Sequence, residues 1–136
     1  MSEFQLDARL ARDSDLVTVL GLCQLRILHD SRWPWLMLVP QRAGKTEVFE
    51  LQPLDQALLT FETNLVAEAL KKVTNARKIN IGALGNVVSQ LQVHVVARNE
   101  GDPNWPGPIW GHGSATAYDE NARKAFLKTL SEALSS

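Results

Sequence analysis

The chain has a single cysteine, Cys23, among its 136 residues, so no intrachain disulfide can form. Cys23 follows the apolar segment Leu20-Gly21-Leu22, where a buried and unreactive thiol is expected. Long apolar runs are missing, and no stretch reaches the length of a membrane span. The stretch Met1-Ser2-Glu3-Phe4 lacks the positive region and apolar run of a signal peptide. These absences predict a cytoplasmic protein without a membrane partner.

The chain also lacks an excess of charge of either sign, because its 14 Lys and Arg residues are balanced by 15 Asp and Glu residues, for a net charge of -1. The basic residues are scattered, which gives no electrostatic reason to expect a nucleic-acid partner. Gly82-Ala83-Leu84-Gly85 has two glycines but no phosphate-loop lysine. Cysteine and histidine do not occur at zinc-ligand spacing, and no serine lies in a nucleophile elbow. We therefore predict neither a metal nor a cofactor.

The apolar fraction of 45% and the length are enough for one domain, residues 1–136, with its own core. Apolar runs and turn residues predict strands at residues 16–20, 22–28, 35–39, 78–84 and 90–98. Residues 4–12 fit either a short helix or an extended arm. Residues 99–113, rich in proline and glycine, predict an irregular segment anchored by Trp105 and Trp110. The order of elements predicts an α+β fold, an antiparallel sheet with one long helix across it and a C-terminal helix.

Two helices carry clear start signals. Pro53 suits a first helical position and Asp55 a first turn, so an amphipathic helix is predicted over residues 53–73. Its predicted core face contains the apolar residues at helical spacing, Leu54, Leu58, Phe61, Leu65 and Ala69. Residues 116–119 predict the cap of a final helix, with its apolar face at Ala122, Phe126, Leu130 and Ala133.

Residues 90–96 alternate between polar and branched apolar side chains. In a strand, such side chains point to opposite faces. The core face is predicted to hold Leu91, Val93 and Val95, and the other face Gln90, Gln92 and His94. The plainest interpretation is a half-buried strand with a solvated outer side. A glycine turn, Gly85-Asn86, precedes this strand, and a Trp-Pro segment that ends in Trp110-Gly111 follows it.

This arrangement resembles the histidine triad superfamily, whose signature is His-φ-His-φ-His-φ-φ with φ apolar. The spacing matches, with Gln90 at the first histidine position, Gln92 at the middle position and His94 at the third. It is most similar to short bacterial members with Gln at the first position and a Trp-Pro…Trp-Gly tail. The resemblance covers residues 23–113 and implies a homodimer whose two sheets join.

The resemblance also implies a chemistry. In family enzymes the middle histidine attacks the α-phosphate of a nucleotide, and the covalent nucleotidyl-histidine is then resolved by water or another acceptor. Gln92 cannot take this role, because resonance delocalises the lone pair of a carboxamide nitrogen. His94 is the remaining imidazole and is expected to contact phosphate; otherwise it is a strand histidine with a backbone partner.

Other site residues follow from the resemblance. Gln90, Asn86 and Asn80 match positions that contact phosphate, although a turn asparagine such as Asn86 is equally explained by turn chemistry. Asp30, in the pair His29-Asp30, matches a ribose-binding position, with a solvated turn as the alternative. Either Trp33 or Trp35 is expected to line the base pocket, Trp33 being our first choice, unless both pack in the core. His112 is a loop histidine to which we assign no role.

The expected function is therefore the binding of a nucleotide or a related phosphorylated small molecule, with weak or lost catalysis. Three explanations of Gln92 stay open: a binding or sensing module, an enzyme that works through His94 or water, or a variant of an active parent. The alternative from another class is a dimeric interaction or structural protein that retains the fold. Whether the chain is an enzyme is left open by the residues.

Overall fold

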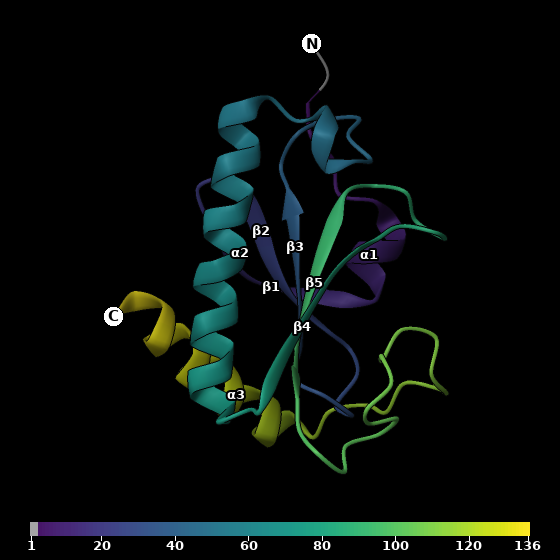
Figure 1. Ribbon diagram of the computed structural model, residues 1–136, viewed down its shortest axis with the longest axis vertical. Helices are drawn as coiled ribbons and strands as arrows, with labels where there is room; N and C mark the ends of the chain where they lie inside the picture. The colour runs from purple at the N-terminus through teal and green to yellow at the C-terminus, as the bar shows by residue number, and fades with distance from the viewer. Residues whose placement is uncertain (1–2) are drawn as a thin grey trace.

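A computed structural model describes residues 3–136 and shows one five-stranded antiparallel sheet (Figure 1). Its strands are β1 (Ser14–Val19), β2 (Cys23–Leu28), β3 (Trp35–Pro40), β4 (Lys78–Leu84) and β5 (Gln92–Arg98). The spatial order is β1-β2-β3-β5-β4, so β1 and β4 are the edges. The predicted α+β fold is confirmed. The expectation that no signal peptide is present rested on Met1-Ser2-Glu3-Phe4, and of these residues Met1 and Ser2 lie outside the described part of the chain.

The long helix α2 (Pro53–Thr74) crosses one face of the sheet, as predicted. It begins with Pro53 in its first turn and ends at Asn75, whose left-handed backbone (φ 52°) closes the helix. The C-terminal helix α3 (Glu120–Ser135) packs against α2 and begins where the Asp119 carboxylate accepts a hydrogen bond from the Ala122 amide. A 3-10 turn, η1 (Val48–Glu50), precedes α2.

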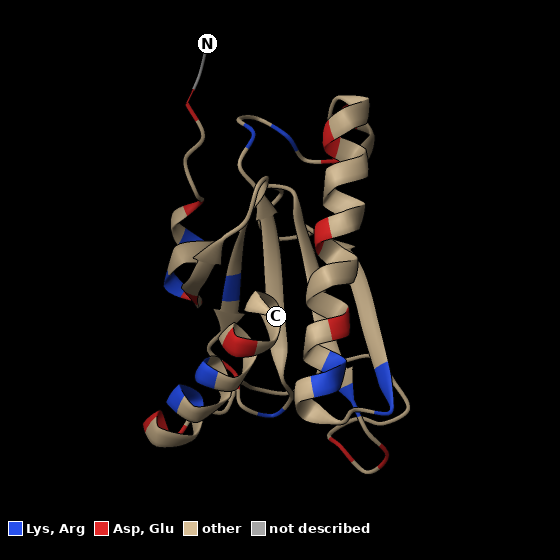
Figure 2. Ribbon diagram, turned by 90° about the vertical axis from the view of Figure 1, so that its left-hand side faces the viewer, with Lys and Arg blue, Asp and Glu red and all other residues tan. Residues whose placement is uncertain are grey.

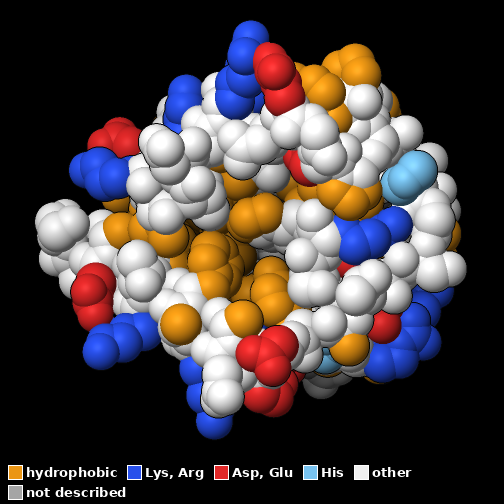
Figure 3. Space-filling view, turned by 90° about the horizontal axis from the view of Figure 1, so that it is seen from below, with side chains coloured by type: hydrophobic (Ala, Val, Ile, Leu, Met, Phe, Trp, Pro, Cys, Tyr) orange, Lys and Arg blue, Asp and Glu red, His pale blue; other side chains and the backbone are white. Residues whose placement is uncertain are grey.

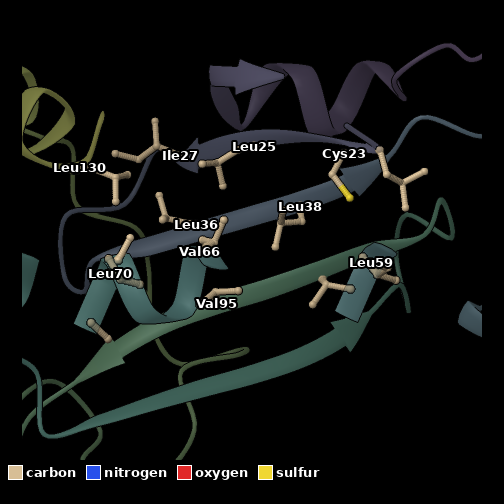
Figure 4. Close-up of a cluster of buried hydrophobic side chains, with 14 of the residues drawn as sticks. Cys23, Leu25, Ile27, Leu36, Leu38, Leu59, Val66, Leu70, Val95 and Leu130 are labelled. Carbon is tan, nitrogen blue, oxygen red and sulfur yellow. The ribbon is translucent and has the colours of Figure 1, made fainter. Parts of the chain in front are cut away.

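The main core lies between the sheet and these two helices (Figure 4). Leu36 and Leu38 of β3 and Val95 of β5 point toward Val66 and Leu70 of α2. Leu91, Val93 and Val95 all belong to this core, which confirms the predicted core face of the last strand. Cys23 is fully buried, and burial raises the pKa of its thiol far above the ordinary value.

The predicted core face of α2 is partly wrong. Leu54 and Phe61 are 80% and 64% exposed, and Leu65 is exposed as well. The buried stripe instead runs through Leu59, Glu62, Thr63, Val66, Ala69 and Leu70. Glu62 belongs to this stripe because its carboxylate accepts hydrogen bonds from two backbone amides, Leu22 N (2.8 Å) and Cys23 N (3.0 Å). Because a glutamate lies in the middle of the buried stripe, the spacing of apolar residues does not reveal this stripe.

The opposite face of the sheet is covered by the N-terminal segment and by loops rather than by a long helix (Figure 1). The short helix α1 (Ala8–Arg12) lies there and buries Leu10 against Met37 and Val39. Segment 99–113 also lies on this side and is irregular, as predicted. It is held by Arg98, 1% exposed, whose guanidinium pairs with Asp102 at 2.9 Å. Seen from the end of the molecule where this segment lies, hydrophobic side chains gather at the centre (Figure 3).

Basic and acidic side chains are interspersed along the face that α2 and α3 present (Figure 2). Within residues 3–136, no helix has the combined length and apolar character that a membrane span requires.

Candidate functional site

Both faces of β5 are covered. Gln92 and His94 lie opposite the α2 face, as the alternation predicted, yet each is only 5% exposed. The interpretation of this face as solvated is therefore wrong for both residues. Covering groups come from elsewhere in the chain, namely Trp35 of β3 and Trp110 of segment 99–113, whose rings lie beside that of His94.

A chain of hydrogen bonds links Trp35, His94 and Gln92. The indole nitrogen Nε1 of Trp35 donates to Nδ1 of His94 at 2.8 Å, and Nε2 of His94 lies 2.9 Å from Oε1 of Gln92. An indole N–H can only donate, so Nδ1 must be the unprotonated nitrogen and Nε2 carries the proton. The direction of the chain thus assigns His94 as a neutral imidazole that donates to Gln92. We call this chain the relay.

The relay ends on the backbone. The amide nitrogen of Gln92 donates to the carbonyl oxygens of Val88 (2.9 Å) and Gln90 (3.0 Å). Both hydrogens of the Gln92 amide are therefore used, while Oε1 accepts from His94. A carboxamide oxygen has two lone pairs, so one of them remains available to a further donor.

Two indoles enclose His94. The ring centres of Trp35 and Trp110 each lie 5.7 Å from that of His94. Gly82 of β4 pairs with His94 across the sheet, and a Cβ atom there would lie 3.1 Å from Cζ2 of Trp110. The glycine thus leaves room for the indole. Burial in these surroundings lowers the pKa of His94 from 6.5 to about 4, so the imidazole is neutral at pH 7.

A cavity of about 530 Å³ opens in front of the relay. Its inner wall is formed by Gln92, His94, Trp35, Trp110 and Met37. Its rim is formed by Arg9 and Arg12 of α1 and by the loop of residues 85–88. The volume falls in the range of small-molecule pockets.

Of the residues predicted to contact phosphate, Asn86 is exposed and lines this cavity. Gln90 precedes β5 and binds the N-terminal segment instead: its Oε1 accepts from Asp7 N at 2.8 Å, and its Nε2 donates to Gln5 O at 2.9 Å. Asn80 lies on β4 two residues before Gly82, where its Oδ1 accepts from Nη1 of Arg98 at 3.1 Å. Gln90 and Asn80 therefore lie outside the cavity lining.

The residues predicted to contact ribose and base are separated. Asp30 is buried and lines a second hollow of about 380 Å³, beside Arg32 and His112. Burial opposes ionisation of Asp30, but hydrogen bonds from Arg32 and the Thr116 amide outweigh it and hold its pKa below the ordinary value. Trp33 is 1% exposed and donates to Pro103 O at 3.0 Å, so it packs in the core. Trp35 takes the place at the cavity that we expected for Trp33.

Sequence reasoning missed several residues of the cavity. Trp110 was expected only as an anchor, and Arg9 and Arg12 at the rim were not expected at all. Gly82, which leaves room for Trp110 without lining the cavity, was not expected either. The tryptophan-glycine pair at residues 110–111 was the one local signal that could have indicated Trp110. The arginines of α1 reach the cavity only through tertiary contacts, which no local pattern predicts. Within residues 3–136, no group of three or more His, Cys, Asp or Glu side chains is placed to hold a metal ion.

Comparison with known proteins agrees with this geometry. The model of the HIT domain family matches residues 9–101. A crystal structure of a histidine triad protein from Sinorhizobium meliloti 1021 is 64% identical, with a TM-score of 0.93 over 95% of this chain and 96% of that one. A histidine triad protein from Bradyrhizobium japonicum is 38% identical, with a TM-score of 0.96 over 98% of this chain and 99% of that one.

A more distant structure shares the fold alone. It is a hypothetical histidine triad nucleotide-binding protein from Sulfolobus tokodaii, 15% identical, with a TM-score of 0.69 over 93% of this chain and 88% of that one. A search of curated proteins finds no match to the chain. The family model covers more than half of the chain, and the Sinorhizobium protein is 64% identical over nearly its whole length. The chain therefore belongs to the histidine triad (HIT) family.

Proposed function

We propose that the chain binds a nucleotide or a related phosphorylated small molecule in the cavity in front of the relay. The observation that supports this most directly is the cavity itself, whose inner wall contains the second and third motif positions, Gln92 and His94. The Sulfolobus relative is named a nucleotide-binding protein. Asn86, and Asp30 in the neighbouring hollow, remain predicted contacts in this proposal.

Binding in this proposal proceeds without a covalent intermediate. The nucleophile of a nucleotidyl transfer needs a nitrogen lone pair directed at phosphorus. The nitrogen of Gln92 has none to offer, and both of its hydrogens are donated to backbone carbonyls. His94 is no replacement, because its unprotonated Nδ1 accepts the Trp35 N–H.

A matched pair of variants tests the location. Leu84 of β4 lines the cavity, whereas Leu54 of α2 is exposed on the opposite side of the sheet. Calorimetric titration with AMP and GMP should show saturable binding to the wild type and to Leu54→Trp. Leu84→Trp should not bind, because the added indole fills the cavity. Circular dichroism verifies that both variants fold. No binding to the wild type, or equal binding to both variants, would contradict the proposal.

A second experiment tests the chemistry. After mixing with adenosine 5′-phosphoramidate, mass spectrometry should find no nucleotidyl adduct on the wild type and little hydrolysis. Gln92→His restores an imidazole on the same strand position and should give a detectable adduct on residue 92. Turnover by the wild type would refute the absence of a nucleophile. No gain in the variant, despite nucleotide binding, would mean that residue 92 is not presented to phosphate.

We also propose that the protein is a cytoplasmic homodimer. A single buried cysteine fits a reducing compartment.

The proposed dimer rests on an apolar surface beside an unpaired strand. The outer side of α2 exposes Phe61 and Leu65, and the edge strand β4 exposes Ile81 (50%). Light scattering should give a dimer mass for the wild type. Phe61→Glu should give a monomer, and Leu16→Glu on the opposite edge strand should remain a dimer. A monomeric wild type would overturn this proposal.

A further inference from the structure

The indole N–H of Trp110 is a hydrogen-bond donor without an acceptor in the described part of the chain. The N–H groups of Trp33 and Trp35 donate to Pro103 O and to Nδ1 of His94, whereas that of Trp110 makes no such bond. Among the residues that the structure describes, no buried side-chain nitrogen or oxygen lacks a partner. Nε1 of Trp110 is therefore open to solvent and available to an acceptor that is not part of the protein.

The place of this N–H is set by the sheet beneath it. Trp110 lines the cavity, and its ring centre lies 5.7 Å from that of His94. A Cβ atom on Gly82 would lie 3.7 Å from Nε1 of Trp110, and Gly82 pairs with His94 between β4 and β5. The edge of the indole that carries the N–H therefore lies next to the third motif position, at the inner end of the cavity.

The other side-chain donors of the inner wall are already used. Trp35 donates to His94, and His94 donates to Gln92. Both amide hydrogens of Gln92 go to backbone carbonyls, and Met37 has no N–H or O–H group. A bound phosphate is normally held by N–H donors. Of the five inner-wall side chains, only that of Trp110 can supply one without breaking the relay.

We propose that Trp110 is a phosphate-binding residue, whose indole N–H donates to a phosphate oxygen of the ligand at the inner end of the cavity. This inference rests on the proposed function and adds a ligand contact from segment 99–113. The contact holds the phosphate beside Gln92, where an imidazole on residue 92 would meet it. It also gives Gly82 a role in binding, because a Cβ atom there would press against the indole at 3.1 Å.

Removal of the N–H with retention of an aromatic ring tests the contact. Trp110→Phe should weaken AMP by about tenfold to a hundredfold, as expected for loss of a hydrogen bond to a charged group, and adenosine by less than about twofold. Trp105→Phe is the matched control in the same segment, because Trp105 does not line the cavity. It should leave both affinities unchanged. Melting temperatures verify that both variants fold.

A second measurement observes the N–H directly in the wild type. The four tryptophans give four indole N–H signals in NMR spectra of isotope-labelled protein, and triple-resonance experiments assign them. AMP and inorganic phosphate should each move the Trp110 signal downfield by more than the other three, because charge-assisted hydrogen bonds are short and strong. Adenosine should move it little. This measurement stands even if Trp110→Phe does not fold.

A third measurement uses the restored nucleophile. In the Gln92→His background, addition of Trp110→Phe should slow formation of the nucleotidyl adduct by about tenfold or more, because the phosphate is held less firmly against residue 92. Addition of Trp105→Phe should leave the rate unchanged, since Trp105 is outside the cavity lining.

The outcomes separate this inference from the proposed function. If Trp110→Phe binds AMP as tightly as the wild type, or weakens AMP and adenosine by the same factor, Trp110 is not a phosphate donor, and nucleotide binding stands. The same holds if AMP binds without moving the Trp110 signal. If neither AMP nor GMP binds to the wild type, the proposed function fails and this inference fails with it. A selective loss of AMP affinity with a shifted Trp110 signal supports both.

Discussion

Protonation of His94 should cost the folded protein stability in a narrow pH range. Burial lowers the pKa of the folded imidazole to about 4, compared with 6.5 for an unperturbed histidine. Below pH 6.5 the unfolded chain therefore takes up a proton that the folded chain does not. Stability is present in full above this pH, is lost as the pH falls toward 4, and changes no further below that through this group.

The linkage relation gives the magnitude. A difference of this size in pKa corresponds to roughly 3 kcal/mol in total, of which about 2 kcal/mol is lost by about pH 5. Acid also reduces the stability that the carboxylates with lowered pKa values, among them Asp30 and Asp102, contribute to the folded protein. This loss occurs mainly below their unfolded pKa, near 3.8. The comparison of about pH 7 with about pH 5 therefore reports mostly on His94.

Urea unfolding followed by tryptophan fluorescence measures this difference. The wild type should lose about 2 kcal/mol more than His94→Gln between the two pH values, because glutamine can bond Trp35 and Gln92 without titrating. His112→Gln, which removes an exposed loop imidazole, is the matched control and should behave as the wild type. An equal loss in the wild type and in His94→Gln would refute the neutral, enclosed imidazole on which the relay depends.

Three further substitutions test the supports of the site by urea unfolding. Arg98→Met leaves Asp102 without its buried partner and should cost about 3–5 kcal/mol; an effect below about 1 kcal/mol would exclude this role. Glu62→Gln should cost about 1–3 kcal/mol, because the new amide group faces a backbone N–H that the carboxylate satisfied, and no change would argue against that bond. Gly82→Ala should cost about 1–3 kcal/mol and shift the fluorescence as Trp110 moves; unchanged emission would contradict the contact.

The fold was largely predictable because its elements are regular and clearly bounded. Strand periodicity, Pro53 and the terminal lysines of α2 are local signals, and each predicted an element that is present. The core face of α2 was not predictable, since Glu62 is buried through two backbone amides some 40 residues earlier in the chain. Helix α1 was left open between a helix and an arm, because its five residues are too few to show a period.

The candidate site was predictable only along the strand. Alternation placed Gln92 and His94 on one face, which the structure confirms, but alternation does not say what covers that face. Trp110 and the residues of α1 arrive through tertiary contacts. For the same reason no local pattern reveals that Gln90, Asn80 and Trp33 each bond to a partner distant in the sequence and lie outside the cavity lining.

The relay also explains how glutamine fits at the second motif position. A neutral histidine there could donate one N–H to the carbonyl of Gln90 and accept the Nε2–H of His94 on its other nitrogen. Gln92 makes both of these bonds, with its amide nitrogen and its oxygen respectively. The direction of hydrogen bonding along the strand is therefore the same for either residue, and His94 needs no change of tautomer. Glutamine differs in having no basic ring nitrogen. It can therefore neither act as a nucleophile when a phosphate displaces the bond from His94 nor carry a positive charge.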